Sequence, residues 1–201
     1  MSKPFVAVID GGGANLASLK FALDRLGAES VVTTDARVIG DASHVILPGV
    51  GAAAAAMQKL REKDLIETIR AISQPFLGIC LGMQLLGSGS EEDGASCLGI
   101  VPEQAVRLTT GPGYPVPNMG WCQLENVASH PLLDDIDNGA WFYFIHSYAL
   151  PVTERVIATS RHASSFAAVL ASGNFCGTQF HPERSSAAGS RLLDNFLRLD
   201  S

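Results

Sequence analysis

The sequence lacks any apolar run long enough to cross a bilayer, and its first residues, MSKPFVAVID, lead straight into a strand-like segment without the layout of a signal peptide. It also lacks an excess of basic residues, since 14 Lys and Arg stand against 20 Asp and Glu for a formal net charge of -6. A chain that binds nucleic acid needs basic side chains to neutralise phosphates. We therefore expect a cytoplasmic protein with neither a membrane nor a nucleic acid as partner.

Cysteine is scarce as well. The four cysteines, at positions 80, 97, 122 and 176, show none of the close C-x-x-C spacing of metal sites and redox motifs. A disulfide framework is not expected in a reducing compartment, so each thiol has to be considered singly. We expect no metal ion and no cofactor.

What the sequence does contain is typical of a compact globular chain. Of its 201 residues, 47% are hydrophobic and 17% are charged, whereas a disordered chain is poorer in apolar residues and richer in charge. A chain of this length can bury one good core, and it shows no internal repeat and no linker that would divide it. We therefore expect one domain over residues 1–201.

The first half of the chain alternates apolar runs, bounded by Gly, Pro and Asp, with helical patterns, which is typical of βα units that build a mostly parallel sheet. The strand at 75–79 should be buried on both faces because its apolar run does not alternate. The predicted strands are 5–9, 30–33, 44–47 and 75–79; the predicted helices are 14–26, one that opens with the alanines at 52–56, and 65–72 with Asp64 as N-cap.

The second half has a different character. Two stretches rich in small residues, Gly and Pro, 88–99 and 111–117, are expected to be loops. A final helix, 187–199, carries its leucines and phenylalanine on one face. Strands with short connections, which imply antiparallel additions to the sheet, are predicted at 104–108, 120–124, 140–145, 155–160, 166–171 and 174–180.

One cysteine stands where a nucleophile would be expected. The motif Gly78-Ile79-Cys80-Leu81-Gly82 places it between two glycines where the predicted strand meets a helical segment, which is the layout of the G-x-S-x-G nucleophile elbow with sulfur in place of oxygen. Glycine neighbours allow a sharp turn and the close approach of a substrate. The beginning of a helix also favours a negatively charged thiolate. A buried structural cysteine is the alternative.

A candidate base comes near the end of the chain, in the motif GTQFHPE. His181 ends a strand-like run, Pro182 fixes the backbone after it, and Glu183 lies two residues on. The carboxylate can orient one nitrogen of the imidazole ring while the other nitrogen faces the thiol, as a triad of nucleophile, base and acid requires. A surface or core histidine is the alternative.

Together, GICLGMQLL and GTQFHPERS resemble the class I glutamine amidotransferases, in which the cysteine of the first motif and the His and Glu of the second form the catalytic triad. The resemblance implies that Cys80, His181 and Glu183 are catalytic. It implies a flavodoxin-like α/β fold with a mostly parallel central sheet, flanking helices and additional antiparallel strands. It also implies that Gln84, one turn beyond the nucleophile, helps to hold the substrate; an exposed helix residue is the alternative.

The loop Pro48-Gly49-Val50-Gly51 follows the third predicted strand. Successive backbone N–H groups in such a glycine-rich turn can bind an oxyanion, together with the N–H of Leu81. An ordinary turn between a strand and a helix is the alternative.

A closer resemblance covers nearly the whole chain. Most class I glutamine amidotransferases have two glycines directly after the loop proline, whereas here Val50 lies between Gly49 and Gly51. This difference favours a resemblance to the member of the class that acts in the histidine pathway. The resemblance implies a heterodimer in which ammonia from L-glutamine passes to a (β/α)8-barrel cyclase. The segments that are similar to the glutaminase subunits of imidazole glycerol phosphate synthase are IDGGGANLASLKFALDRLG, LPGVGAAAAAM, LGICLGMQLLG, PNMGWCQL, WFYFIHSYALP and GTQFHPERSSAAGSRLLDNFL.

Two positions depart from that family, since relatives usually have His where Asn118 stands and Asn where Cys122 stands, in a segment that by resemblance meets the cyclase. Cys97, Cys122 and Cys176 have no adjacent base and are interpreted as structural. Aromatic residues and Arg anchor interfaces, although core packing is the alternative for the aromatic ones. The candidates for the partner surface are Asn118, Met119, Trp121, Tyr143, His146, Tyr148 and Arg184.

Two other functions remain open from the sequence. One is a glutaminase subunit that feeds a different synthase, against which Val50 and the MGW segment argue. The other is a catalytically silent binding protein on the same fold, in which Cys80 serves only as a redox-sensitive thiol.

Overall fold

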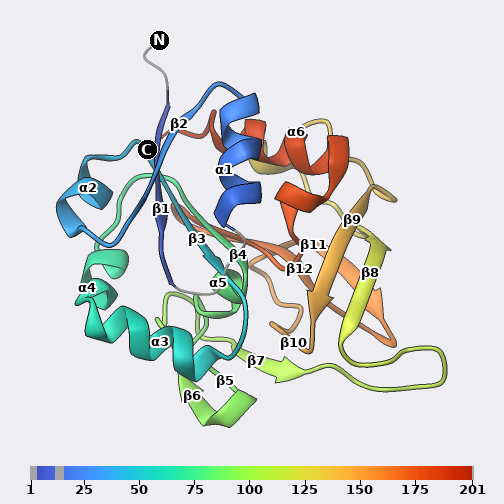
Figure 1. Cartoon of the computed structure of the whole chain (residues 1–201). Coiled ribbons are helices and arrows are strands. Elements are labelled where there is room, and N and C mark those ends of the chain that lie inside the picture. Colours follow the sequence, from blue (N-terminus) through green and yellow to red (C-terminus); the bar gives the residue numbers. More distant parts are fainter. Residues whose placement is uncertain (1–3, 12–15, 201) are drawn as a thin grey trace.

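The structure is a computed structural model that describes residues 4–11 and 16–200 (Figure 1). Within these residues the centre is a seven-stranded sheet of order β11-β12-β13-β4-β3-β1-β2. Neighbours among β2, β1, β3, β4 and β13 run parallel, and β12 is antiparallel to both β13 and β11. These strands are β1 Phe5–Ile9, β2 Glu29–Thr33, β3 His44–Gly49, β4 Phe76–Cys80, β11 Val156–His162, β12 Ser164–Ser172 and β13 Phe175–Thr178.

Helices cover both faces of this sheet (Figure 1). Residues of α1 and α6 pack in one hydrophobic cluster, and those of α2, α3 and α4 in a second. In β1, Val6 and Val8 belong to the first cluster while Ala7 and Ile9 belong to the second, as the alternation of a strand requires. The helices are α1 Leu16–Arg25, α2 Ala36–Asp41, α3 Ala53–Glu62, α4 Leu65–Arg70, α5 Leu81–Gln84 and α6 Ser186–Phe196.

The predicted α/β architecture with a mostly parallel sheet is confirmed, and so is the double burial of β4, whose five residues are all buried. Parallel strands with helices on both faces bury both sides, which explains the unbroken apolar runs.

The placement of several second-half strands is a correction. The segments predicted at 104–108, 120–124 and 140–145 do not join the main sheet but form small separate sheets, and β13 pairs with β4 in parallel. Periodicity identifies a strand but not its partner, which is why these pairings were missed. The small sheets are β10-β7-β5-β6 and β8-β9, with β5 Gly89–Ser90, β6 Ala95–Ser96, β7 Gln104–Arg107, β8 Asn118–Gln123, β9 Trp141–His146 and β10 Tyr148–Ala149.

Other local predictions also change. The expected loop at 88–99 contains β5, β6 and a short 3-10 helix, Glu92–Gly94, and the sequence analysis did not predict α2. Asp64 precedes α4 as predicted, but it has a left-handed backbone (φ 54°) and its side chain makes no capping hydrogen bond. Residues 14 and 15 of the first predicted helix lie outside the described residues, and α1 begins at Leu16.

No helix within residues 4–11 and 16–200 is both long enough and apolar enough to span a membrane.

Candidate active site

Cys80 is the last residue of β4 and directly precedes α5. Its backbone is strained, with φ 55° and ψ -109°, values that a residue with a side chain seldom adopts. The turn from strand to helix with a strained nucleophile position is the geometry of a nucleophile elbow. The predicted elbow is therefore present, and the residue is 5% exposed.

The glycines around Cys80 are required by close packing. A Cβ atom on Gly82 would lie 1.8 Å from the carbonyl oxygen of Leu47, and one on Gly78 would lie 2.6 Å from the carbonyl oxygen of Gly82. Real Cβ atoms do not approach other atoms this closely. The elbow consequently rests against the end of β3 with no room for a side chain.

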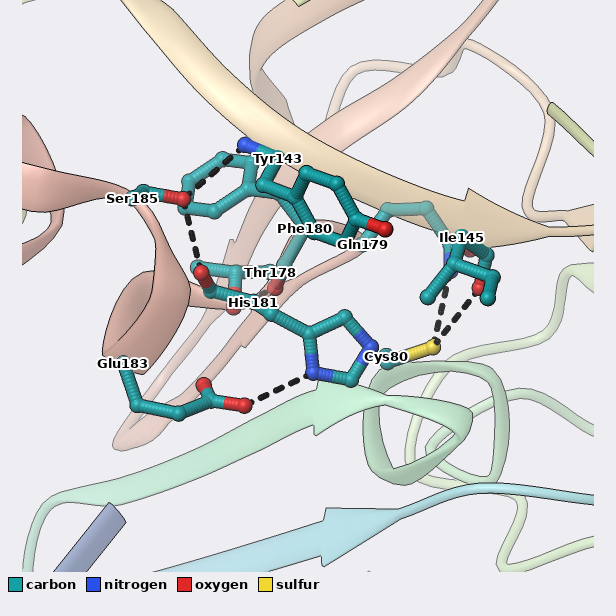
Figure 2. A network of polar contacts seen from close by, with 9 residues as sticks. All are labelled: Cys80, Tyr143, Ile145, Thr178, Gln179, Phe180, His181, Glu183 and Ser185. Atoms are coloured by element: carbon teal, nitrogen blue, oxygen red, sulfur yellow. Dashed lines mark hydrogen bonds and ion pairs between the residues drawn. The ribbon is translucent and has the colours of Figure 1, made fainter. Parts of the chain in front are cut away.

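His181 and Glu183 lie beside Cys80 in space. The Nδ1 atom of His181 is 2.8 Å from the Oε1 atom of Glu183, and both side chains are almost fully buried. Figure 2 shows the imidazole ring between the Glu183 carboxylate and Cys80, with one ring nitrogen turned to each. The three residues that the sequence analysis selected are therefore brought together from β4 and from the segment after β13.

The charge environment of His181 favours its protonated form. Burial by itself lowers the pKa of the ring, but the interactions with Cys80 and with Glu183 outweigh burial and raise the pKa to about 10. An imidazolium at neutral pH stabilises a neighbouring thiolate, because the opposite charges attract at short range.

The backbone of β9 holds the histidine segment in place. The N–H of His181 donates to the carbonyl oxygen of Tyr143 at 2.9 Å. The Ser185 hydroxyl donates to the His181 carbonyl oxygen at 2.7 Å and accepts from the Tyr143 N–H at 3.0 Å (Figure 2). These bonds fix the backbone of His181, so the position of its ring does not depend on Glu183 alone. Ser185 was not predicted as a site residue, although it ends the motif GTQFHPERS.

A cavity of about 250 Å³ opens on Cys80. Val50, Gly51, Leu81 and Gln84 line it, so most of the predicted oxyanion and substrate residues surround one space with the nucleophile. Gly49, the last residue of β3, instead lines a second cavity, of about 150 Å³, together with the histidine and the glutamate of the site. Val50 borders both cavities. The volume of the first suits a small metabolite rather than a large cofactor.

Gln84 is buried, which excludes the alternative of an exposed helix residue. Its Nε2 atom donates to the carbonyl oxygen of Tyr148 at 2.7 Å and to the Oε1 atom of Gln179 at 3.0 Å. With the amide nitrogen held in this way, the oxygen of the Gln84 side chain is the atom left to contact a ligand in the cavity.

Gln179 was not predicted as a site residue, although this residue belongs to the GTQFHPE motif. Its side chain is fully buried, and its Nε2 atom donates to the Cys80 Sγ atom at 3.7 Å. One feature of the sequence could have indicated a role for Gln179, since it is a long polar residue within a strand-like apolar run. Without the pairing of β13 and β4, nothing placed it beside the nucleophile.

The β8-β9 pair separates the partner-surface candidates into two groups. Burial alternates along both strands, so Met119 and Trp121 point outward with 62% and 48% of their surface exposed, whereas Asn118 and His146 point inward with 4% and 5%. Asn118 and His146 are therefore corrected to internal residues, hydrogen-bonded to each other at 3.1 Å between Nδ2 and Nε2. Tyr148 lines the cavity on Cys80.

The outward side chains form one surface with Arg184. Its guanidinium carbon lies 4.5 Å from the ring centroid of Tyr143, and that ring meets Trp121 edge-on with centroids 6.1 Å apart. We call Met119, Trp121, Tyr143 and Arg184 the aromatic face. It adjoins the triad, because Arg184 also borders the second cavity.

The remaining cysteines agree with a structural interpretation. Burial raises the pKa of the Cys97 thiol to about 11 and that of Cys176 to about 12, and burial also raises the pKa of Cys122. A thiol with a raised pKa has little thiolate at neutral pH and reacts slowly. Among the described residues no group of three or more His, Cys, Asp or Glu side chains could hold a metal ion.

Comparisons with known proteins identify the class of protein to which this fold belongs. The sequence matches the family Glutamine amidotransferase class-I over residues 7–199, and the chain belongs to this class. Its structure is similar to that of a glutamine amidotransferase, with a TM-score of 0.73, 22% identity and 96% coverage of each chain. It is also similar to a glutamine amidotransferase from Thermotoga maritima, with a TM-score of 0.68, 19% identity, and coverage of 95% of this chain and 81% of that chain.

Comparison with sequence relatives identifies the subfamily within this class. A protein of Pectobacterium atrosepticum named imidazole glycerol phosphate synthase subunit HisH is 51% identical over 195 residues, which is 96% of this chain and 99% of that protein. Proteins of the same name from Xylella fastidiosa and Vibrio cholerae are 48% and 47% identical, covering 98% and 96% of this chain and 98% of each relative. The chain is therefore a glutamine amidotransferase of the HisH family.

Proposed function

We propose that this chain hydrolyses L-glutamine to glutamate and ammonia with Cys80 as nucleophile, His181 as proton donor and base, and Glu183 as the group that orients the imidazole. The observation that carries the proposal is the position of the His181 ring, between a carboxylate oxygen 2.8 Å away and the cysteine at the strained end of a buried strand. Such a constellation activates a nucleophile for acyl transfer.

The first half of the reaction releases ammonia. The Cys80 thiolate forms a bond to the carboxamide carbon of glutamine, and the electron pair of the carbonyl moves onto oxygen. When the carbonyl re-forms, the C–N bond breaks, and the departing nitrogen takes its proton from the His181 imidazolium. The raised pKa of His181, about 10, means that this proton is available at neutral pH.

The second half restores the enzyme. His181, now neutral, takes a proton from a water molecule, whose oxygen attacks the carbonyl carbon of the glutamyl thioester. The C–S bond breaks, the thiolate of Cys80 returns, and glutamate leaves. Glu183 stabilises the imidazolium formed in this step and keeps Nδ1 directed at its own Oε1 atom.

Backbone N–H groups around the cavity would hold the oxyanion. The candidates belong to Gly49, Val50, Gly51 and Leu81, and the N–H of Leu81 is the first of α5, where no intrahelical acceptor exists. Removing one such donor typically costs about 100- to 1000-fold in rate. Gln84 would contact the glutamine through its side-chain oxygen.

The product ammonia would pass to a cyclase subunit in the cytoplasm. HisH relatives are named as subunits of imidazole glycerol phosphate synthase, and in the proposed heterodimer the cyclase uses ammonia to make imidazole glycerol phosphate and an aminoimidazole carboxamide ribotide for histidine biosynthesis. The aromatic face is the proposed docking surface, because exposed aromatic residues, Met and Arg are the types that anchor interfaces. Its contact with the second cavity supports transfer of ammonia without release into solvent.

Labelling with a glutamine-analogue electrophile tests the chemistry. In the presence of the cyclase, the analogue should modify Cys80 and spare Cys97, Cys122 and Cys176, and glutamine should protect Cys80. Cys80→Ala should lower glutamine hydrolysis by about 10⁴-fold or more, whereas Cys97→Ala should leave it unchanged. A folded chain that is neither labelled nor active with the cyclase would be a binding protein, and the proposal would be wrong.

Ammonia transfer tests the partner. The chain and the cyclase should co-purify, glutamine should support formation of imidazole glycerol phosphate, and added ammonium salts should replace the chain. High glutamine turnover by the purified chain alone, equal to its turnover with the cyclase, would contradict the coupling. So would activation by another synthase and not by the cyclase.

A further inference from the structure

Gln179 occupies a position that the chemistry proposed above does not use. It follows β13, and β13 pairs in parallel with β4 so that Thr178 is level with Ile79. Gln179 comes directly after Thr178, as Cys80 comes directly after Ile79, and its Nε2 atom reaches the Cys80 Sγ atom. On the other side of β4, Gly49 of β3 is paired with Cys80. The nucleophile is thus flanked by a glycine and by a buried amide.

Both polar atoms of the Gln179 side chain form hydrogen bonds inside the site. Its Nε2 atom donates to the Cys80 Sγ atom at 3.7 Å, and its Oε1 atom accepts from the Nε2 atom of Gln84 at 3.0 Å. Gln84 can only donate from that nitrogen, so the amide of Gln179 is oriented with its N–H groups toward the sulfur. The orientation follows from the network rather than from the side chain alone.

The other polar contact of the sulfur favours the neutral thiol. The Sγ atom lies 3.6 Å from the carbonyl oxygen of Ile145 on β9, which can accept a hydrogen bond from S–H but repels a thiolate (Figure 2). When the proton leaves Cys80, this contact turns unfavourable. Gln179 offers, on another side of the sulfur, a donor that remains after ionisation.

We propose that Gln179 is a further catalytic residue, whose side-chain N–H group stabilises the Cys80 thiolate and aims its sulfur into the cavity. The proposal rests on the proposed function, in which that thiolate is the nucleophile. The amide acts alongside His181. The histidine transfers the proton, whereas the glutamine side chain does not ionise and remains a neutral hydrogen-bond donor throughout the reaction.

The titratable groups around the sulfur determine how the proposal can be measured. His181 faces it directly with Glu183 behind, and Glu92, His146 and Tyr148 line the same cavity as Cys80. The pKa of His146 is lowered to about 4, chiefly by burial, so this ring is neutral near pH 7. A midpoint for ionisation measured at the thiol belongs to the coupled pair of Cys80 and His181.

The experiment is the pH dependence of alkylation of Cys80 by iodoacetamide in the full chain, followed for each cysteine separately by mass spectrometry. Gln179→Glu keeps the acceptor for Gln84 but replaces the donor with a negative charge, and its alkylation midpoint should rise by roughly one to two pH units. Gln179→Met keeps the volume without the donor, and its midpoint should rise by roughly half to one unit. The matched control Gln104→Glu, an exposed residue of β7, should leave the midpoint unchanged.

Kinetics with the cyclase give a second readout. Gln179→Met should lower kcat for glutamine hydrolysis by about 10-fold with little change in KM, since the donor acts on the nucleophile and not on the bound substrate. Folded Gln179→Met whose midpoint and kcat match the wild type would overturn the inference while leaving the triad intact. A wild-type Cys80 that shows no reactive thiolate and no activity with the cyclase would overturn the inference together with the proposed function.

Discussion

The carboxyl end of β4 contacts β9 through Cys80 and Ile145, yet the strand pairs β3-β4 and β8-β9 bury their residues differently. Every residue of β3 and β4 is buried, whereas burial in β8 and β9 alternates from one residue to the next. In β3 and β4 a larger side chain at any position would meet packed atoms, and this packing holds the strained backbone of Cys80. In β8 and β9, one face stabilises the fold and the other is free to contact a partner. Activity and partner binding should therefore respond to mutation separately.

The strongest test of this comparison is Gly82→Ala in the elbow. The added Cβ atom would meet the Leu47 carbonyl oxygen at 1.8 Å, so we expect a loss of more than about 3 kcal/mol in the free energy of unfolding, or no folded protein. Gly40→Ala is the control, because a Cβ atom there meets nothing within 4 Å, and in α2 alanine should stabilise by up to about 1 kcal/mol. Urea unfolding of both variants measures the difference, and equal stabilities would contradict the tight packing of the elbow.

A change within the proposed triad should affect activity, and the melting temperature measures its effect on stability. Glu183→Gln removes the charge beside His181 at similar volume, and we expect kcat for glutamine hydrolysis with the cyclase to fall by about 100-fold or more. Because the carboxylate helps to raise the pKa of His181 to about 10, its loss lowers that pKa.

The sign of the pH effect follows. In the proposed mechanism the release of ammonia needs the imidazolium, so activity should decline as pH rises through the pKa of His181, and in Glu183→Gln this decline should begin at lower pH than in the wild type. Rate against pH, measured with melting temperature as the check on folding, tests both parts. A decline at the same pH in both proteins would show that Glu183 does not control the charge of the ring.

The outward face of β8 and β9 should affect partner binding and leave the nucleophile unchanged. Trp121→Ala on the aromatic face is expected to weaken cyclase binding by about 2 kcal/mol, or roughly 30-fold in Kd. Trp141→Ala is the matched control. Trp141 is similarly exposed (52%) and lies on the same side of β9 as Tyr143, but it is not one of the four residues that form the aromatic face. Titration calorimetry measures both, and equal losses would mean that the docking surface is wider than proposed.

The smallest effect is expected on the inward face. Cys122 donates only a weak hydrogen bond, 3.7 Å from Sγ to the Oδ1 atom of Asn118, so Cys122→Ala should cost less than about 1 kcal/mol in unfolding. Alkylation of Cys80 should not change. A loss above about 2 kcal/mol would show that this face is packed as tightly as the strand ends and would remove the contrast between the two strand pairs.

The sequence by itself determined the features that depend on near neighbours along the chain. The glycines of Gly78-Ile79-Cys80-Leu81-Gly82 predicted a sharp turn because only glycine fits there, and the spacing of His181 and Glu183 allowed the 2.8 Å contact because only Pro182 separates them. Unbroken apolar runs predicted strands buried on both faces, since parallel strands lie between two layers of helices.

Only the tertiary structure decided which distant segments meet. The parallel pairing of β13 with β4 brings Gln179 to Cys80, and the pairing of β8 with β9 sets Asn118 opposite His146 with both residues buried. Alternation along a strand tells which side chains share a face, but the choice of neighbouring strand and the register depend on contacts between residues far apart in the chain. For this reason the meeting of Cys80, His181 and Glu183 was predictable from their motifs, while the amide beside the Cys80 sulfur was not.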